Sequence, residues 1–91
     1  PVLPHAIQLY QNYPNPFNLS TVTSFQLPVS SHVTLQVFDV LGREVATLVE
    51  GELAAGEHTV VFDGKDLPTG VYFYQIKTAS FSQTRKAALM R

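Results

Sequence analysis

The chain of 91 residues contains no cysteine and no tryptophan, and it has only six basic and seven acidic residues. The lack of cysteine excludes disulfide scaffolds, thiolate metal sites and thiol catalysis. The formal net charge of −1, with acids and bases interspersed, argues against a nucleic acid or an anionic membrane as partner. The apolar runs, such as residues 87–90, are far shorter than the ~20 residues of a membrane-spanning helix, so no such helix is expected.

Apolar and polar residues alternate with period two along most of the chain, and no window keeps a helical stripe. In residues 21–27 this pattern puts Thr23, Phe25 and Leu27 on one face, and in residues 32–38 it directs alternate valine and leucine side chains inward. Further strands are expected at residues 7–10, 44–49, 57–62, 71–78 and 81–90. The sequence therefore predicts an all-β fold, an immunoglobulin-like antiparallel β-sandwich of about seven strands.

Turn signals separate these strands. Asp39 and Gly42 indicate a turn in which the carboxylate bonds the following backbone and the glycine takes a positive φ. Residues 51–56 are expected to form a short loop, and Pro68 with Gly70 predicts a turn before the next strand. Tyr72 follows it, where a tyrosine corner of a sandwich would lie, although a tyrosine with its hydroxyl in solvent is an equal alternative.

One segment fits neither a helix nor a regular strand, and we call it the strap. It consists of Asn12, Tyr13, Pro14, Asn15, Pro16, Phe17 and Asn18. The prolines remove N–H donors and favour extended geometry in the residues before them. The side chains of Asn15 and Asn18 are suited to bonding nearby backbone. We expect the rings of Tyr13 and Phe17 to pack on the core.

No catalytic, cofactor or metal site is expected. Asp63 and Asp66 flank a glycine turn without an apolar wall, so they are interpreted as turn-capping carboxylates. A calcium ion there would need more oxygen ligands than this turn supplies. The three histidines lack the short spacing of a zinc site, and His58, which alternates with apolar residues, is expected to be partly buried and bonded to backbone.

Two features leave alternatives open. Five aromatic residues would suit the sugar platform of a carbohydrate-binding module, unless the sandwich covers them: Tyr10, Tyr13, Phe17, Phe73 and Tyr74. Arg85, Lys86 and Arg91 make the last segment basic. This segment can present an edge strand to a receptor by β-augmentation, or its charges can protect that edge from aggregation.

Four segments together resemble the C-terminal sorting domains, of the class called type A, of cargo proteins of the type IX secretion system in Bacteroidetes and related bacteria. They are residues 11–18, 37–45, 67–74, and 83–86 with the apolar run to 91. The sequence departs from the family pattern at Leu19, where a further proline is common, and at residues 87–88, where a bulkier pair is common. The resemblance extends in fold to the immunoglobulin-like domain of the flagellar hook-capping protein.

This resemblance implies a non-enzymatic domain at residues 6–91, with residues 1–5 as the end of an interdomain linker. Such a domain directs a preceding cargo, often a hydrolase, from the periplasm through an outer-membrane translocon to the cell surface or the medium. A sortase-like cysteine peptidase then usually removes it. The resemblance assigns Arg85, Lys86 and Arg91 to recognition by the translocon, and Gly70 and Tyr72 to a turn-strand motif. We expect Gly42, Gly70, Pro14 and Pro16 to act through the fold. It implies no cofactor and no small-molecule substrate. A carbohydrate-binding module and a structural spacer are the alternative functions.

Overall fold

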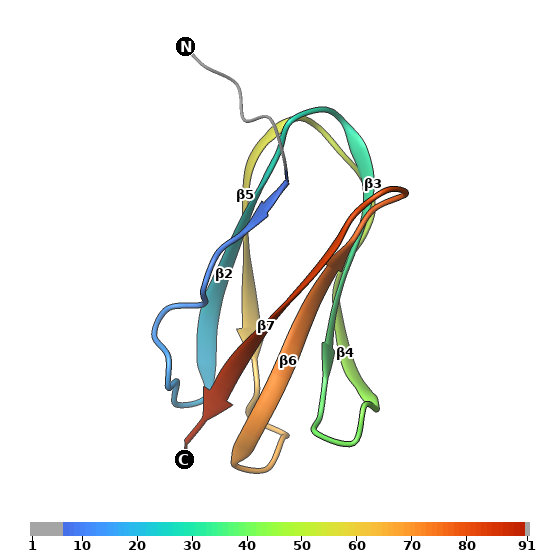
Figure 1. The fold of residues 1–91 in the computed structure, drawn as a ribbon. Helices are drawn as coiled ribbons and strands as arrows, with labels where there is room; N and C mark the ends of the chain where they lie inside the picture. The colour runs from blue at the N-terminus through green and yellow to red at the C-terminus, as the bar shows by residue number, and fades with distance from the viewer. Residues whose placement is uncertain (1–6, 91) are drawn as a thin grey trace.

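The computed structural model describes residues 7–90, which form two antiparallel sheets packed face to face (Figure 1). The strands are β1 (Gln8–Leu9), β2 (Ser20–Leu27), β3 (Ser31–Phe38), β4 (Glu44–Leu53), β5 (Gly56–Asp63), β6 (Gly70–Lys77) and β7 (Ser82–Leu89). The three-stranded sheet has the order β1-β2-β5, and the four-stranded sheet has the order β4-β3-β6-β7. The predicted all-β sandwich of seven strands is therefore confirmed.

The core lies between the sheets, where alternate residues of β2, β3 and β6 point inward. The side chains expected to face inward from β2 and β3 are all buried. The largest fully buried side chains are Phe17, Phe25, Leu9, Leu27, Leu35, Ile76, Leu89, Val33, Val37 and Thr23. Because each large apolar side chain contributes about 1.5–3 kcal/mol when it is fully buried, this layer is the main source of stability.

The prediction of a loop at residues 51–56 is wrong, because residues 51–53 belong to β4. β4 continues through Gly51, which pairs with Val33, to Leu53, which pairs with Ser31. Two residues, 54–55, then connect it to β5. A glycine in this position favours the end of a strand, but the pairing of Gly51 with Val33 continues the strand past it. The register of β3 and β4 also shifts at two places, so the burial of β4 does not alternate regularly.

The sandwich has two distinct ends (Figure 1). One end, which we call the motif end, is formed by the strap, the turn at residues 39–43, the loop at residues 64–69 and the last described residue. The opposite end is formed by residue 7 and the connections at residues 28–30, 54–55 and 78–81. The molecule is 40 Å long in its greatest dimension, so the first described residues lie far from the motif end.

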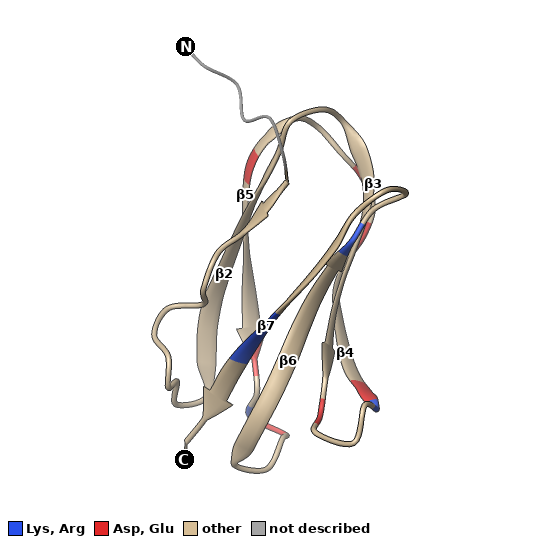
Figure 2. Ribbon diagram, viewed as in Figure 1, with Lys and Arg blue, Asp and Glu red and all other residues tan. Residues whose placement is uncertain are grey.

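Acidic and basic residues are spread over the strands and turns and do not form a large patch of one charge, as Figure 2 shows. No helix among residues 7–90 has the length and apolar character needed to cross a membrane.

Candidate functional site

Asn12 fixes the start of the strap inside the sandwich. It is 2% exposed, and its backbone N–H donates to the hydroxyl of Tyr74 at 2.8 Å. That hydroxyl donates in turn to the carbonyl of Tyr10 at 2.9 Å. The side-chain amide of Asn12 donates to Thr21 Oγ1 at 3.0 Å and to the Pro14 carbonyl at 3.1 Å. A buried asparagine is tolerated here because these groups are bonded.

Phe17 connects the strap to β7. Its backbone N–H donates to the carbonyl of Ala88, and its carbonyl accepts from Met90 N–H, both at 2.8 Å. The side chain of Asn15 accepts from Ala88 N–H at 3.0 Å. The Phe17 ring is 1% exposed and lies 5.6 Å from the ring of Phe62. The expected packing of Phe17 is confirmed, and Asn15 bonds backbone that is distant in sequence rather than nearby.

The expectation for Tyr13 is wrong, since its side chain is 81% exposed. Tyr13 forms a bridge with Val22 of β2, and hydrogen bonds join the two residues in both directions. The neighbours of Val22, Thr21 and Thr23, point into the core. A residue opposite Val22 therefore lies on the outer face of the three-stranded sheet.

The basic residues of the last strand have different environments. Arg85 Nε donates to the Leu9 carbonyl at 2.6 Å, so this partly buried side chain ties β7 to β1. The Gln11 side chain donates to the Lys86 carbonyl at 2.8 Å. The Lys86 side chain points to solvent, and Arg91 lies outside the described residues. β7 is an edge strand, but the strap and the segment before it cover much of its outer edge.

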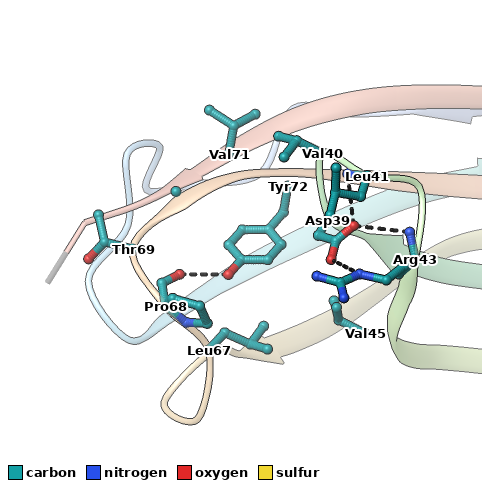
Figure 3. Close-up of a pocket in the computed structure, with 11 residues that line it drawn as sticks. Asp39, Val40, Leu41, Arg43, Val45, Leu67, Pro68, Thr69, Val71 and Tyr72 are labelled. Atoms are coloured by element: carbon teal, nitrogen blue, oxygen red, sulfur yellow. Dashed lines mark hydrogen bonds and ion pairs between the residues drawn. The ribbon is translucent and has the colours of Figure 1, made fainter.

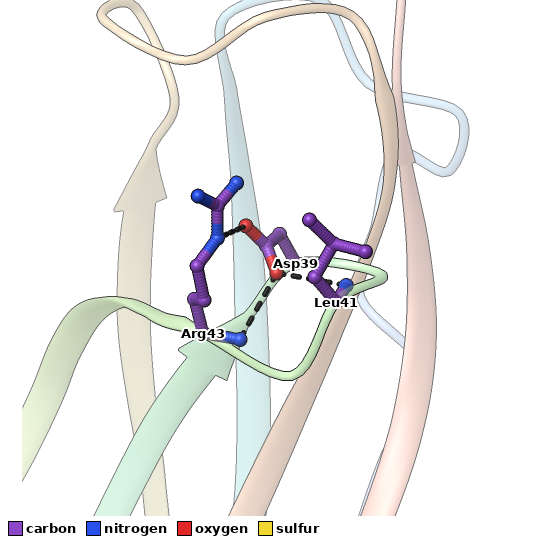
Figure 4. A network of polar contacts seen from close by, with 3 residues as sticks. All are labelled: Asp39, Leu41 and Arg43. Atoms are coloured by element: carbon purple, nitrogen blue, oxygen red, sulfur yellow. Dashed lines mark hydrogen bonds and ion pairs between the residues drawn. The ribbon is translucent and has the colours of Figure 1, made fainter.

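The turn at residues 39–43 is built by one carboxylate (Figure 4). Asp39 Oδ1 accepts from the N–H groups of Leu41 at 2.9 Å and Arg43 at 3.0 Å. Its Oδ2 accepts from Arg43 Nε at 2.9 Å. The Arg43 backbone N–H, more than any other group, holds the pKa of Asp39 below its ordinary value, and the guanidinium adds to the effect. Gly42 has a φ of +83°, so the expected turn and its positive-φ glycine are confirmed.

Tyr72 forms a tyrosine corner. Its hydroxyl donates to the Pro68 carbonyl at 2.6 Å, and its side chain is 4% exposed. The alternative of a hydroxyl in solvent is therefore wrong. Gly70 begins β6 with a φ of +157°. The corner fixes the loop before β6 against the strand that follows it.

The turn and this loop border an open pocket of about 330 Å³ at the motif end, which we call the end pocket (Figure 3). Its exposed rim and walls are mainly apolar and include Val40, Leu41, Leu67, Pro68 and Val71. Arg43 also lines it. The sequence motifs at residues 37–45 and 67–74, which are more than twenty residues apart, thus meet around one pocket.

The remaining candidate groups serve the local structure. Asp63 Oδ1 accepts from Lys65 N–H at 3.0 Å, as expected of a turn carboxylate, and Asp66 is exposed. His58 is half-buried and its ring bonds the Ala54 carbonyl at 2.8 Å, as predicted. Within residues 7–90, no three histidine, cysteine, aspartate or glutamate residues gather as metal ligands.

The five aromatic residues do not share a plane. Phe17 and Tyr74 are buried in the core, and Tyr10 is half-buried. Phe73 lies between two inward-facing tyrosines of β6, so it faces outward from the four-stranded sheet, whereas Tyr13 faces outward from the other sheet. A sugar platform built from these residues is therefore not supported by their geometry.

The fold and its motif end define a small immunoglobulin-like β-sandwich module closed by a strap. The family model described as "Secretion system C-terminal sorting domain" matches residues 11–90. The chain therefore belongs to the family of secretion system C-terminal sorting domains, and the resemblance described above is confirmed. Membership of this family gives the chain a role in secretion sorting.

A solved structure supports the fold. The chain resembles part of PorZ, described as an essential bacterial surface component of the type-IX secretion system of human oral-microbiomic Porphyromonas gingivalis. The TM-score is 0.63 and the identity 17%, over 93% of this chain and 11% of that chain. The chain thus corresponds to a small part of that protein, and at this identity the likeness concerns the fold. No curated protein matches the sequence.

Proposed function

We propose that residues 6–91 form a non-catalytic sorting domain that directs a preceding cargo from the periplasm through the type IX outer-membrane translocon to the cell surface or the medium. In this proposal residues 1–5 end the linker to the cargo, and a sortase-like cysteine peptidase removes the domain after export. The family match and the fold support it.

The observation that carries the proposal is the gathering of the motifs at one end of the sandwich. The strap bonds β7 through Phe17, and Gly64 N–H donates to the carbonyl of Leu19, the residue directly after the strap, which joins this part of the chain to the loop before β6. The same loop and the turn at residues 39–43 line the end pocket. The first described residues lie at the other end. A cargo attached before residue 7 would leave the motif end free for a receptor.

The test is a fusion of this chain to the C-terminus of a reporter with a signal peptide, expressed in a type IX secreting bacterium. We expect the reporter at the surface or in the medium, with residues 1–91 lost and export dependent on the translocon. Cell fractionation and intact mass measure both parts. Reporter held in the periplasm with the folded domain attached would contradict the proposal and favour a structural spacer.

The separate roles of the basic residues are tested with substitutions at matched positions. Lys86→Gln removes an exposed charge from β7 and should reduce export while the melting temperature stays unchanged. Lys77→Gln, an exposed charge at the end of β6, is the control. Arg85→Gln also removes the hydrogen bond to the Leu9 carbonyl. The export of this variant therefore has to be compared with its melting temperature. If Lys86→Gln and Lys77→Gln are exported like the parent chain, Lys86 is not part of the signal.

A further inference from the structure

Two apolar side chains at the motif end are exposed and lie outside the hydrophobic core. Val40 is 67% exposed and Leu41 is 73% exposed, at the tip of the turn between β3 and β4. The turn itself is held by Asp39 and Gly42, and its two tip positions accept polar residues equally well. Exposed apolar residues at the mouth of a cavity are typical of an interaction site.

The two charged residues that line the pocket form an ion pair, and Arg43 is its exposed partner. Asp39 is 16% exposed, and its two oxygens already accept three hydrogen bonds inside the turn. The Arg43 side chain is 72% exposed and uses Nε for the ion pair, so its two terminal nitrogens extend beyond that contact (Figure 4). A guanidinium in this position suits a carboxylate, since paired N–H groups match two carboxylate oxygens.

The backbone at Gly70, which lines the pocket, and at Gly42 in the adjoining turn is accessible as well. A Cβ atom built on Gly42 or Gly70 would meet no atom within 4 Å, so the surface above both glycines is open. The tyrosine ring in the pocket wall, Tyr72, is buried and its hydroxyl is bonded to Pro68. The pocket therefore offers no exposed aromatic ring for sugar stacking, and its chemistry suits an extended peptide.

We infer that the end pocket binds an extended segment of a partner protein in which an apolar side chain lies next to a carboxylate. The apolar side chain enters the pocket that Leu41, Leu67 and Val71 line, and the carboxylate pairs with Arg43. This inference rests on the proposed sorting function, in which the partner belongs to the export apparatus. It assigns a partner contact to residues 37–45 and 67–74, and this contact is separate from the one proposed for the basic last strand.

The first test uses export of the reporter fusion. The double variant V40S/L41S should keep the parent melting temperature and lower the export rate by at least about tenfold, because an apolar anchor is lost. The control V22S/V61S removes two exposed valines from the outer face of the three-stranded sheet and should be exported like the parent chain. Export of V40S/L41S at the parent rate would overturn the inference while the proposed function stands.

The second test does not depend on export. A displayed library of short random peptides is selected on the purified chain and on V40S/L41S. We expect the parent chain to enrich peptides with an apolar residue beside Asp or Glu, and we expect V40S/L41S to enrich none. Binding of a selected peptide should fall at least about tenfold in Arg43→Gln and less in Arg43→Lys, which keeps the charge.

Peptides enriched without an acidic residue, or equally on both chains, would overturn the inference. So would a concentration-dependent dimer in sedimentation that V40S/L41S abolishes, because the pocket would then bind a second copy. If the parent fusion itself is not exported, the proposed function fails, and the peptide selection alone decides whether the pocket binds such a segment.

Discussion

At the scale of single residues, the polar groups of the strap determine where it lies. Asn12 is buried, and its backbone and side-chain groups have partners on β2, on β6 and within the strap. Tyr74 supplies one of these partners from the opposite sheet. Such bonds position a segment more sharply than apolar contact does, because a buried polar group without its partner is costly.

Tyr74→Phe should therefore lower the free energy of unfolding by about 1–3 kcal/mol, since it leaves the buried Asn12 N–H without an acceptor. Chemical denaturation measures the change. Tyr13→Phe removes a hydroxyl from a side chain that is 81% exposed and should stay within about 0.5 kcal/mol of the parent chain. Equal stability of the two variants would show that the Tyr74 hydroxyl does not hold the strap.

Position 42 requires glycine because of its backbone conformation, although a side chain would have room there. Its φ of +83° is in the left-handed region, and a Cβ there would meet no atom within 4 Å. Gly42→Ala should lower the free energy of unfolding by about 1–2 kcal/mol through backbone strain alone. Gly42→Asn should cost less, because asparagine tolerates this region. A thermal melt of both variants gives the answer, and a Gly42→Asn variant less stable than Gly42→Ala would contradict this reason.

At the scale of elements, the sequence predicted the strands in which apolar and polar residues alternate regularly. It failed where pairing with a distant segment overrides the local preference of the backbone. The inward faces of β2 and β3 follow from period two alone, because each strand has one face on the core. The end of β4 was missed because Gly51 pairs with Val33, and Tyr13 was misplaced because its partner is Val22. Both errors involve pairing between distant residues, which a local pattern does not contain.

The turn at residues 39–43 should be sensitive to acid. The folded chain holds the pKa of Asp39 below its ordinary value, chiefly through the Arg43 backbone N–H, so the unfolded chain takes up the proton at higher pH. The stability contributed by this carboxylate is complete above the unfolded pKa of about 3.9 and is lost as the pH falls through the lower folded pKa.

Asp39→Asn removes this titration. It should be less stable than the parent chain at neutral pH, and the difference should shrink as the pH falls below about 4. Urea unfolding of both chains across this range measures the difference, which cancels the contributions of the other carboxylates. A difference that stays constant down to about pH 2 would mean that the hydrogen bonds of Asp39 do not depend on its charge.

The strap should protect the last strand from solvent exchange. Asn15 accepts from the N–H of Ala88, on the outer edge of β7. Asn15→Ala should raise the hydrogen-exchange rate of this amide and lower the free energy of unfolding by about 0.5–1.5 kcal/mol. The exposed Asn18 in the same strap provides the control, and Asn18→Ala should leave the exchange rate of Ala88 unchanged. Equal exchange in both variants would mean that other contacts protect this edge.

At the scale of the whole molecule, the first and last motifs form one structural unit. Phe17 bridges to Leu89 across more than seventy residues of sequence, and both side chains lie in the core. No local pattern in the sequence brings these segments together, although each was recognised separately as a motif. The consequence is that β7 has two roles: it completes the core through alternate residues and presents the intervening residues to solvent.

Deleting residues 86–91 should therefore unfold the sandwich as well as remove a signal. The deletion takes Ala87 and Leu89 from the core and leaves both backbone groups of Phe17 without partners. Because the loss of one large core side chain costs about 2–5 kcal/mol and whole domains are stable by about 5–15 kcal/mol, we expect no cooperative thermal transition. Lys86→Gln keeps these contacts and should melt like the parent chain. A cooperative melt of the deleted chain near the parent temperature would show that the end of β7 is dispensable for folding, and loss of export on deletion would then report the signal directly.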